Sequence, residues 1–304
     1  MTDKPTLLLI DDEERILRSL AMLFRGHYNL YTTTDPQEAL SLVSRMPVHV
    51  IVSDQKMPLM RGAELLRQVK ERSPSTLRIL LTGYSELEAV VSSVNDGEIY
   101  RFINKPWDAQ ELRTTVAEAA TISLRLYAEA GRAPSPRLEA AGAAVLVIDE
   151  DVEVFRAVQE IAHTDVIWAT HLGQALEALE RGGIGVIVSE LAVQGESVGA
   201  LLKLLKAQHP EIVTIVLTPV QDVGLFIGLI NQGQIYRLLP KPLRRGPFSM
   251  NLMSALRHHQ VLKQSPLQLS VHRVQPLQAQ PADAGVATRV LGFLSRMRTR
   301  AATG

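Results

Sequence analysis

Residues 50–60 read VIVSDQKMPLM, and residues 186–196 read VIVSELAVQGE. Each segment opens with the same apolar run and the same serine, and then carries an acid, Asp54 in the first copy and Glu190 in the second. Such a run is typical of a parallel strand covered on both faces, and an acid after it lies at the carboxyl end of the sheet. The repeat therefore predicts two related domains that differ at one functional position.

Two further repeats support a duplication. The segment SVNDGEIYRFINKPW (93–107) aligns without gaps with LINQGQIYRLLPKPL (229–243), and seven of the fifteen positions are identical. TLLLIDDEERIL (6–17) aligns similarly with AVLVIDEDVEVF (144–155). A spacing of about 136 residues is the size of a domain and much longer than a solenoid repeat.

The composition limits the class of protein. The chain has 304 residues with 32 basic and 32 acidic side chains, so it has no net electrostatic field that would attract nucleic acid. It has no cysteine, which excludes disulfides and thiolate metal sites. The N-terminus lacks the pattern of a signal peptide, and no stretch reaches the roughly 18–20 apolar residues of a membrane span. We therefore expect a soluble cytoplasmic protein.

Short apolar runs alternate with helical periodicity in each copy. In the first copy we predict strands over 6–10, 28–33, 48–53, 77–82 and 99–103, with helices over 15–24, 36–45, 62–72, 86–95 and 108–130. Five βα units in series predict an α/β fold with a doubly wound parallel sheet. We expect two such domains in tandem, over 1–130 and 144–263, joined by a Pro- and Gly-containing linker over 131–143. Residues 264–304 form a Gln- and Pro-rich tail typical of disordered segments, with a candidate basic amphipathic helix over 286–300.

Polar side chains follow the predicted strands of the first copy. Asp11 and Asp12 end the first strand, Asp54 the third and Thr82 the fourth, and Lys105 follows the fifth. The carboxyl ends of parallel strands meet at one edge, so three carboxylates, a hydroxyl and an ammonium converge there. Crowded carboxylates favour a hard cation such as Mg²⁺, and Asp54 is then a candidate nucleophile for phosphoryl transfer.

The segments IDDE, VSDQKMP, LLTGYS and IYRFINKPWD make residues 5–130 resemble the receiver domain of two-component response regulators, of the kind found in hydrogenase regulators and with cyclic-dinucleotide phosphodiesterases. The resemblance implies a flavodoxin-like sheet with strand order 2-1-3-4-5, the topology that such receivers share. It also implies that Asp54 accepts phosphate from a sensor histidine kinase or phosphotransfer protein. Asp12, Asp54 and the carbonyl of Lys56 would ligate Mg²⁺, with Asp11 behind them. Thr82 and Phe102 would respond to the phosphate, although Phe102 as permanent core remains an alternative.

The second copy retains most of this pattern. Asp149, Glu150, Thr218 and Lys241 stand where the first copy has Asp11, Asp12, Thr82 and Lys105, whereas Glu190 replaces Asp54 and Leu238 replaces Phe102. Phosphoryl transfer depends on positioning, so one extra methylene makes Glu190 a poor acceptor. We expect a pseudo-receiver. Whether Glu190 mimics a phosphorylated state or only pairs with Lys241 stays open.

No DNA-binding, zinc or nucleotide-binding motif follows either copy, so we expect a non-enzymatic protein without direct DNA binding. Output would then be contact with an unknown downstream protein, or a homodimer. A constitutive scaffold is the alternative. A phosphatase of the haloacid dehalogenase type is disfavoured because Lys56 occupies the place of its second aspartate. Lys56 and Tyr84 could screen the phosphate from water, which predicts slow self-dephosphorylation.

Overall fold

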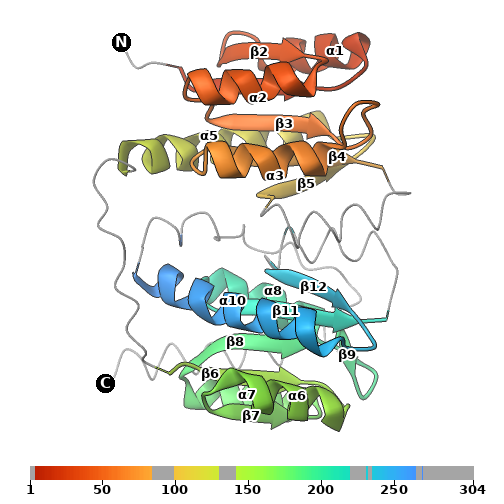
Figure 1. Ribbon diagram of the computed structural model, residues 1–304, viewed down its shortest axis with the longest axis vertical. Helices are drawn as coiled ribbons and strands as arrows, with labels where there is room; N and C mark the ends of the chain where they lie inside the picture. The colour runs from red at the N-terminus through yellow and green to blue at the C-terminus, as the bar shows by residue number, and fades with distance from the viewer. Residues whose placement is uncertain are drawn as a thin grey trace. The chain divides into compact units, whose positions relative to one another are not determined.

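The computed structural model describes residues 4–83, 99–129, 142–219, 231, 235–264 and 269. The predicted helices over 86–95 and 286–300, most of the linker and Tyr84 lie outside these ranges. The described chain divides into two compact units, one containing strands β1 to β5 and the other strands β6 to β12. Each unit is an α/β structure built on a five-stranded sheet (Figure 1).

The first unit has a fully parallel sheet in the order β2-β1-β3-β4-β5. Its strands and helices are β1 (Thr6–Ile10), α1 (Glu14–Phe24), β2 (Asn29–Thr33), α2 (Pro36–Arg45), β3 (Val50–Asp54), α3 (Gly62–Arg72), β4 (Leu77–Thr82), β5 (Arg101–Asn104) and α5 (Ala109–Glu129). Helices α2 and α3 pack together on one face of the sheet, and α1 and α5 on the other (Figure 1). The five predicted strands are confirmed to within two residues at each end.

Continuous apolar runs produce the central strands because both faces of the sheet are covered. Leu7, Leu8, Leu9 and Ile10 of β1 are completely buried, as are the apolar residues of β3. Polar residues define the helix ends. Asp35 accepts a hydrogen bond from the backbone N–H of Gln37 before α2, and Asp108 accepts from Gln110 and Glu111 at the start of α5. The predicted helix start at Asp108 is thereby confirmed.

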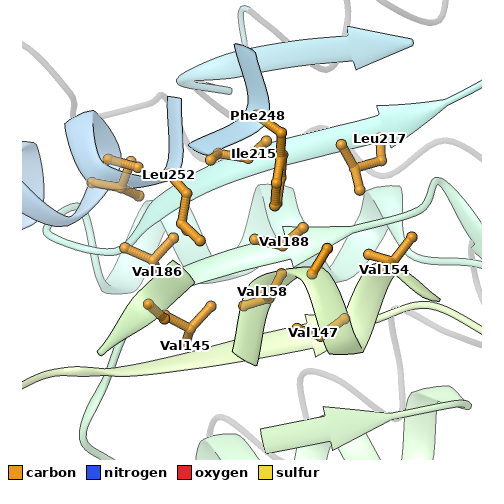
Figure 2. Packing of buried hydrophobic residues seen from close by; sticks show 14 of the residues in the cluster. Val145, Val147, Val154, Val158, Val186, Val188, Ile215, Leu217, Phe248 and Leu252 are labelled. Atoms are coloured by element: carbon orange, nitrogen blue, oxygen red, sulfur yellow. The ribbon is translucent and has the colours of Figure 1, made fainter. Parts of the chain in front are cut away.

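The second unit repeats this topology. Its parallel sheet has the order β12-β11-β8-β6-β7, which in chain order is again 2-1-3-4-5. The elements are β6 (Ala144–Ile148), α6 (Val152–Ala162), β7 (Val166–Ala169), α7 (Leu172–Arg181), β8 (Ile184–Ser189), α8 (Gly199–Gln208), β11 (Val213–Thr218), β12 (Arg237–Pro240) and α10 (Arg245–Gln264). In Figure 2, valines of β6 and β8 and Ile215 and Leu217 of β11 face Val154 and Val158 of α6 and Phe248 and Leu252 of α10.

A small antiparallel hairpin in the second unit was not predicted. Strands β9 (Ala192–Val193) and β10 (Glu196–Ser197) pair across a turn at Gln194 and Gly195. The φ angles of these two residues are 50° and 75°, as in the turns that favour tight hairpins. Strands of two residues are too short to show an alternating apolar pattern, which is why the sequence pattern did not reveal them.

In each unit, one side chain of the last helix contacts a backbone carbonyl of a loop. In the first unit the Ser123 hydroxyl of α5 donates to the carbonyl oxygen of Ser75 over 2.7 Å. In the second unit the His259 ring of α10 lies with Nδ1 2.8 Å from the carbonyl oxygen of Glu211. Both pairs are 48 residues apart in sequence, so the same anchoring of the last helix is made by different side chains.

Candidate functional site

Two buried aspartates meet at the carboxyl edge of the first sheet. Asp11 directly follows β1 and Asp54 is the last residue of β3, and these strands are neighbours with Ile10 opposite Ser53. Asp11 is 1% and Asp54 5% exposed. Two carboxylates so close and so shielded from water require a compensating positive charge.

Lys105 supplies that charge. Its Nζ lies 2.6 Å from Oδ1 of Asp54 and 3.2 Å from Oδ2 of Asp11. The Lys105 backbone N–H donates to the carbonyl of Thr82 over 2.8 Å, which fixes the lysine at the end of the sheet. Burial alone would lower the pKa of Lys105, but the hydrogen bond and charge of Asp54, together with Asp11, raise it above its ordinary value.

Backbone amides hold the two aspartates in place. The N–H of Lys56 donates to Oδ2 of Asp54 over 2.8 Å, and that of Glu13 to Oδ1 of Asp11 over 2.9 Å. Burial raises the pKa of Asp11, and the Glu13 amide and Lys105 offset only part of this effect while the charge of Asp54 adds to it. The site therefore has fixed carboxylate positions before any ligand arrives.

A cavity of about 510 Å³ opens beside these side chains. Its lining residues are Asp12, Glu13, Asp54, Lys56, Met57, Pro58, Gly83 and Lys105. Asp12 is exposed, and within the described part of the chain its carboxylate makes no hydrogen bond or ion pair. Across the same residues, no three Asp, Glu or His side chains cluster closely enough to hold a metal unaided. This donor set fits Mg²⁺, which binds one or two carboxylates and fills its shell with water and phosphate oxygens.

The two predicted switch residues are both buried. Thr82 ends β4 with no exposed surface, and its Oγ1 lies 3.3 Å from the carbonyl oxygen of Gly83. Phe102 is 1% exposed and lies opposite Leu80 in the pairing of β4 with β5. Thr82 thus lies directly before Gly83, which lines the cavity, whereas Phe102 lies in the core.

Two residues near the site were not predicted from the sequence. A Cβ on Gly62, at the start of α3, would lie 2.0 Å from the carbonyl oxygen of Asp54, so only glycine permits this approach. The Trp107 ring centre lies 6.0 Å from Nζ of Lys105. A glycine at the start of a helix that follows the acidic strand is a signal that could have identified Gly62.

The second unit brings the corresponding residues together. Nζ of Lys241 lies 2.9 Å from Oδ1 and 2.8 Å from Oδ2 of Asp149, and 2.8 Å from Oε2 of Glu190. The other carboxylate oxygen of Glu190 accepts from the backbone N–H of Leu191 over 3.1 Å. Burial opposes protonation of Lys241, but Asp149 and Glu190 together raise its pKa. Glu190 is therefore paired with the lysine.

The remaining predicted residues of the second site also lie at the sheet edge. Thr218 ends β11 and is 4% exposed, and its carbonyl accepts from the Lys241 N–H over 3.3 Å. The Glu150 carboxylate accepts from the backbone N–H of Gln194, in the hairpin turn. Trp168, on β7, donates from its indole to the carbonyl of Asp149 over 2.8 Å. Leu238, at the position of Phe102, is 2% exposed.

No helix in the described ranges is both long and apolar enough to cross a membrane. Among known proteins, residues 7–117 match the family of response regulator receiver domains. The chain is similar to the hydrogenase transcriptional regulatory protein HoxA of Cupriavidus necator, with 39% identity over 120 residues, which is 39% of this chain and 25% of that protein. HoxA of Bradyrhizobium diazoefficiens is 34% identical over 122 residues, covering 40% and 25% respectively.

A similar solved structure is the signal receiver domain of an HD domain-containing protein from Pseudomonas fluorescens Pf-5. It is 36% identical with a TM-score of 0.40, and the match covers 44% of this chain and 96% of that one. The matched region of this chain spans about a quarter of the length of the two HoxA proteins. The family match, the strand order and the acidic sheet edge agree, and residues 7–117 therefore form a response regulator receiver domain of the kind used in two-component regulatory systems.

Proposed function

We propose that the chain is a response regulator that accepts a phosphoryl group on Asp54 from a sensor histidine kinase or a phosphotransfer protein. The observation that carries this proposal is the Asp54 carboxylate beside the cavity, with Lys105 Nζ at 2.6 Å. A carboxylate oxygen of Asp54 forms a bond to phosphorus while the bond from phosphorus to the histidine nitrogen breaks, and the nitrogen keeps the electron pair. Lys105 then balances the charge of the transferred group, because its Nζ already lies within reach of both aspartates.

Mg²⁺ is the cofactor that these residues favour. Asp12 and Asp54 would hold it with the carbonyl of Lys56, and Asp11 would support them from the buried side. When bound, Mg²⁺ neutralises negative charge on the phosphoryl oxygens. Lys56 lines the cavity from the loop after β3, where, together with Tyr84, it would screen the phosphate from water. Slow self-dephosphorylation remains a prediction.

The second unit is, in this proposal, a receiver-like module without an acceptor. It has the same sheet order and an equivalent lysine, but Glu190 occupies the acceptor position and is already paired with Lys241. We assign it an output or regulatory role through protein contacts in the cytoplasm. The HoxA relatives are named transcriptional regulators, and we extend only the receiver function to this chain.

Phosphotransfer profiling tests the proposal. The purified chain is mixed with each autophosphorylated histidine kinase of its organism in Mg²⁺ buffer, and transfer is followed on gels. We expect rapid transfer from one or a few kinases and none to Asp54→Asn, which keeps the size of the side chain but removes the nucleophile. No transfer from any kinase, or transfer that persists in Asp54→Asn, would contradict the proposal.

A constitutive interaction protein is the second candidate, and the internally paired Glu190 and Lys241 favour it. The two candidates differ in the effect of phosphate on conformation. We expect acetyl phosphate to change hydrogen exchange in β4 and β5 of the parent and to leave Asp54→Asn unchanged. Identical exchange with and without phosphate in both proteins would favour the constitutive alternative.

A further inference from the structure

The two sheet-edge sites have the same formal charge. Each combines three carboxylates with one ammonium, namely Asp11, Asp12, Asp54 and Lys105 in the first unit, and Asp149, Glu150, Glu190 and Lys241 in the second. Charge alone would therefore make both sites attractive to a divalent cation. The difference between the sites lies in what each carboxylate already contacts.

Asp12 and Glu150 differ most. Asp12 lines the open cavity, and its carboxylate has no protein partner among the described residues. Glu150 follows β6 as Asp12 follows β1, but its carboxylate accepts a hydrogen bond from the backbone N–H of Gln194. The carboxylate that stays available in the first unit is thus engaged by the β9–β10 hairpin in the second.

The hairpin occupies the place of the cavity-lining loop. The N–H of Gly62 donates to the carbonyl of Gln55 in the first unit, and the N–H of Val198 donates to the carbonyl of Leu191 in the second. This common contact aligns Lys56 with Ala192, at the start of the hairpin. Val193 in the hairpin is 1% exposed, so the hairpin packs into the unit.

The cavity of the second unit has a different lining. A volume of about 620 Å³ is bounded by Lys241 and by residues from the start of α6, the end of β11 and the start of α10, namely Asp151, Glu153, Val154, Ala157, Pro219, Pro242, Leu243 and Arg245. None of Asp149, Glu150 and Glu190 lines it. The two acids that do line it, Asp151 and Glu153, belong to the start of α6 and are engaged there: Asp151 accepts from the Glu153 N–H, and Glu153 pairs with Arg156. A cation in this cavity would therefore meet Lys241, Arg245 and these two acids instead of the site's carboxylates.

We infer that the second site is closed by its own side chains, with Glu150 acting as a clamp on the β9–β10 hairpin, and that it binds no divalent cation. Mg²⁺ would have to break the contact of Glu150 with Gln194 and compete with Lys241 for Asp149 and Glu190. Mg²⁺ also dehydrates reluctantly and demands near-octahedral geometry, so a site whose carboxylates are already engaged binds it poorly. This inference rests on the proposed function, because that proposal assigns the magnesium site to the first unit.

The chain contains two tryptophans, and one lies at each site. Trp107 lies beside Lys105, and Trp168 donates to the carbonyl of Asp149. The full chain with Trp168→Phe therefore reports the first site, and the full chain with Trp107→Phe reports the second. Each is titrated with MgCl₂, with NaCl at matched ionic strength as the control.

We expect a saturable change in Trp107 emission and no change in Trp168 emission beyond the salt control. A saturable response of Trp168 to Mg²⁺ would overturn the inference. If Trp107 emission did not change with MgCl₂, the magnesium site of the proposed function would be contradicted. Unchanged Trp168 emission would still support the closed second site. The two failures are thus distinguishable.

Hydrogen exchange tests the clamp directly. Glu150→Ala removes the acceptor, whereas Glu150→Gln keeps a side-chain carbonyl oxygen that can accept from Gln194. We expect exchange of residues 192–198 to accelerate at least about tenfold in Glu150→Ala and to return toward the parent rate in Glu150→Gln. Glu153→Ala, another exposed acid of the same unit, serves as the matched control. Equal hairpin exchange in Glu150→Ala and Glu153→Ala would overturn the inference.

Discussion

Lys206 is a buried lysine of the second unit. This residue of α8 is 4% exposed, and its Nζ donates to the carbonyls of Pro210 and Ile212 over 2.6 and 2.9 Å. Burial lowers its pKa to about 7, and the opposing charge of Glu211 restores only part of the ordinary value. His209 and His259 lie in the same cluster, each in contact with Glu211.

The depressed pKa of Lys206 predicts that stability rises with pH. The unfolded chain keeps the proton up to the model-peptide value of 10.5, whereas the folded chain releases it near 7. Between these values the unfolded state binds more protons, so the free energy of unfolding increases with pH, by about 5 kcal/mol at most across the window. Below pH 7 both states are protonated, and Lys206 adds no further slope.

Denaturant unfolding of the full chain at several pH values, followed by Trp168 in the Trp107→Phe background, measures this slope. Lys206→Met should flatten the curve between about pH 7 and 10, and Lys203→Met, on the same helix but half-buried, should leave it as in the parent. An unchanged slope in Lys206→Met would show that another group is responsible.

Sequence patterns could identify the chemistry of the first site but not its contacts. Asp54 ends β3, and Asp11 and Lys105 directly follow β1 and β5, so topology alone brings these residues to one edge. The burial of Lys206 could not be predicted in the same way, because it depends on two backbone carbonyls in a loop. The engagement of Glu150 likewise depends on the position of a turn N–H.

At the scale of elements, the packing of α3 against β3 positions the acceptor. Gly62 begins the helix in contact with the end of β3, where a Cβ would come within 2.0 Å of the Asp54 carbonyl oxygen and 2.8 Å of its carbon. Backbone atoms cannot yield as a flexible side chain would. The helix or the strand must therefore shift if this residue acquires a side chain.

Gly62→Ala should destabilise the first unit by about 1–3 kcal/mol, as overpacking does, and slow phosphorylation of Asp54. Unfolding followed by Trp107 in the Trp168→Phe background gives the first quantity. Gly246→Ala is the matched control, because a Cβ there meets no atom within 4 Å and alanine favours a helix. A neutral Gly62→Ala with normal phosphorylation would show that α3 does not set the position of Asp54.

Most elements could be predicted because their patterns are long. The strand over 77–82 and the helices over 36–45 and 62–72 have the predicted bounds, since continuous apolar runs and helical spacing define them. The hairpin of β9 and β10 could not be predicted from the sequence, because its strands have two residues each. It is also the element by which the second site differs most from the first.

At the scale of the whole chain, the two units have the same sheet order but differ at their sheet-edge sites. Both units have the same strand order, and both anchor the last helix to a loop carbonyl, through Ser123 in one and His259 in the other. The repeats in the sequence predicted the second sheet because apolar patterns survive many substitutions. They did not predict how the site closes, because single hydrogen bonds decide that.

We expect the whole chain to take one phosphoryl group, at Asp54, and none at Glu190. Intact-protein mass spectrometry after incubation with acetyl phosphate and Mg²⁺, followed by borohydride trapping and peptide mapping, tests it most directly. We expect a single hydroxylamine-labile phosphoryl group that maps to Asp54 and is lost in Asp54→Asn. A chain that takes no phosphate at Asp54 from any donor, or one modified at Glu190, would contradict it.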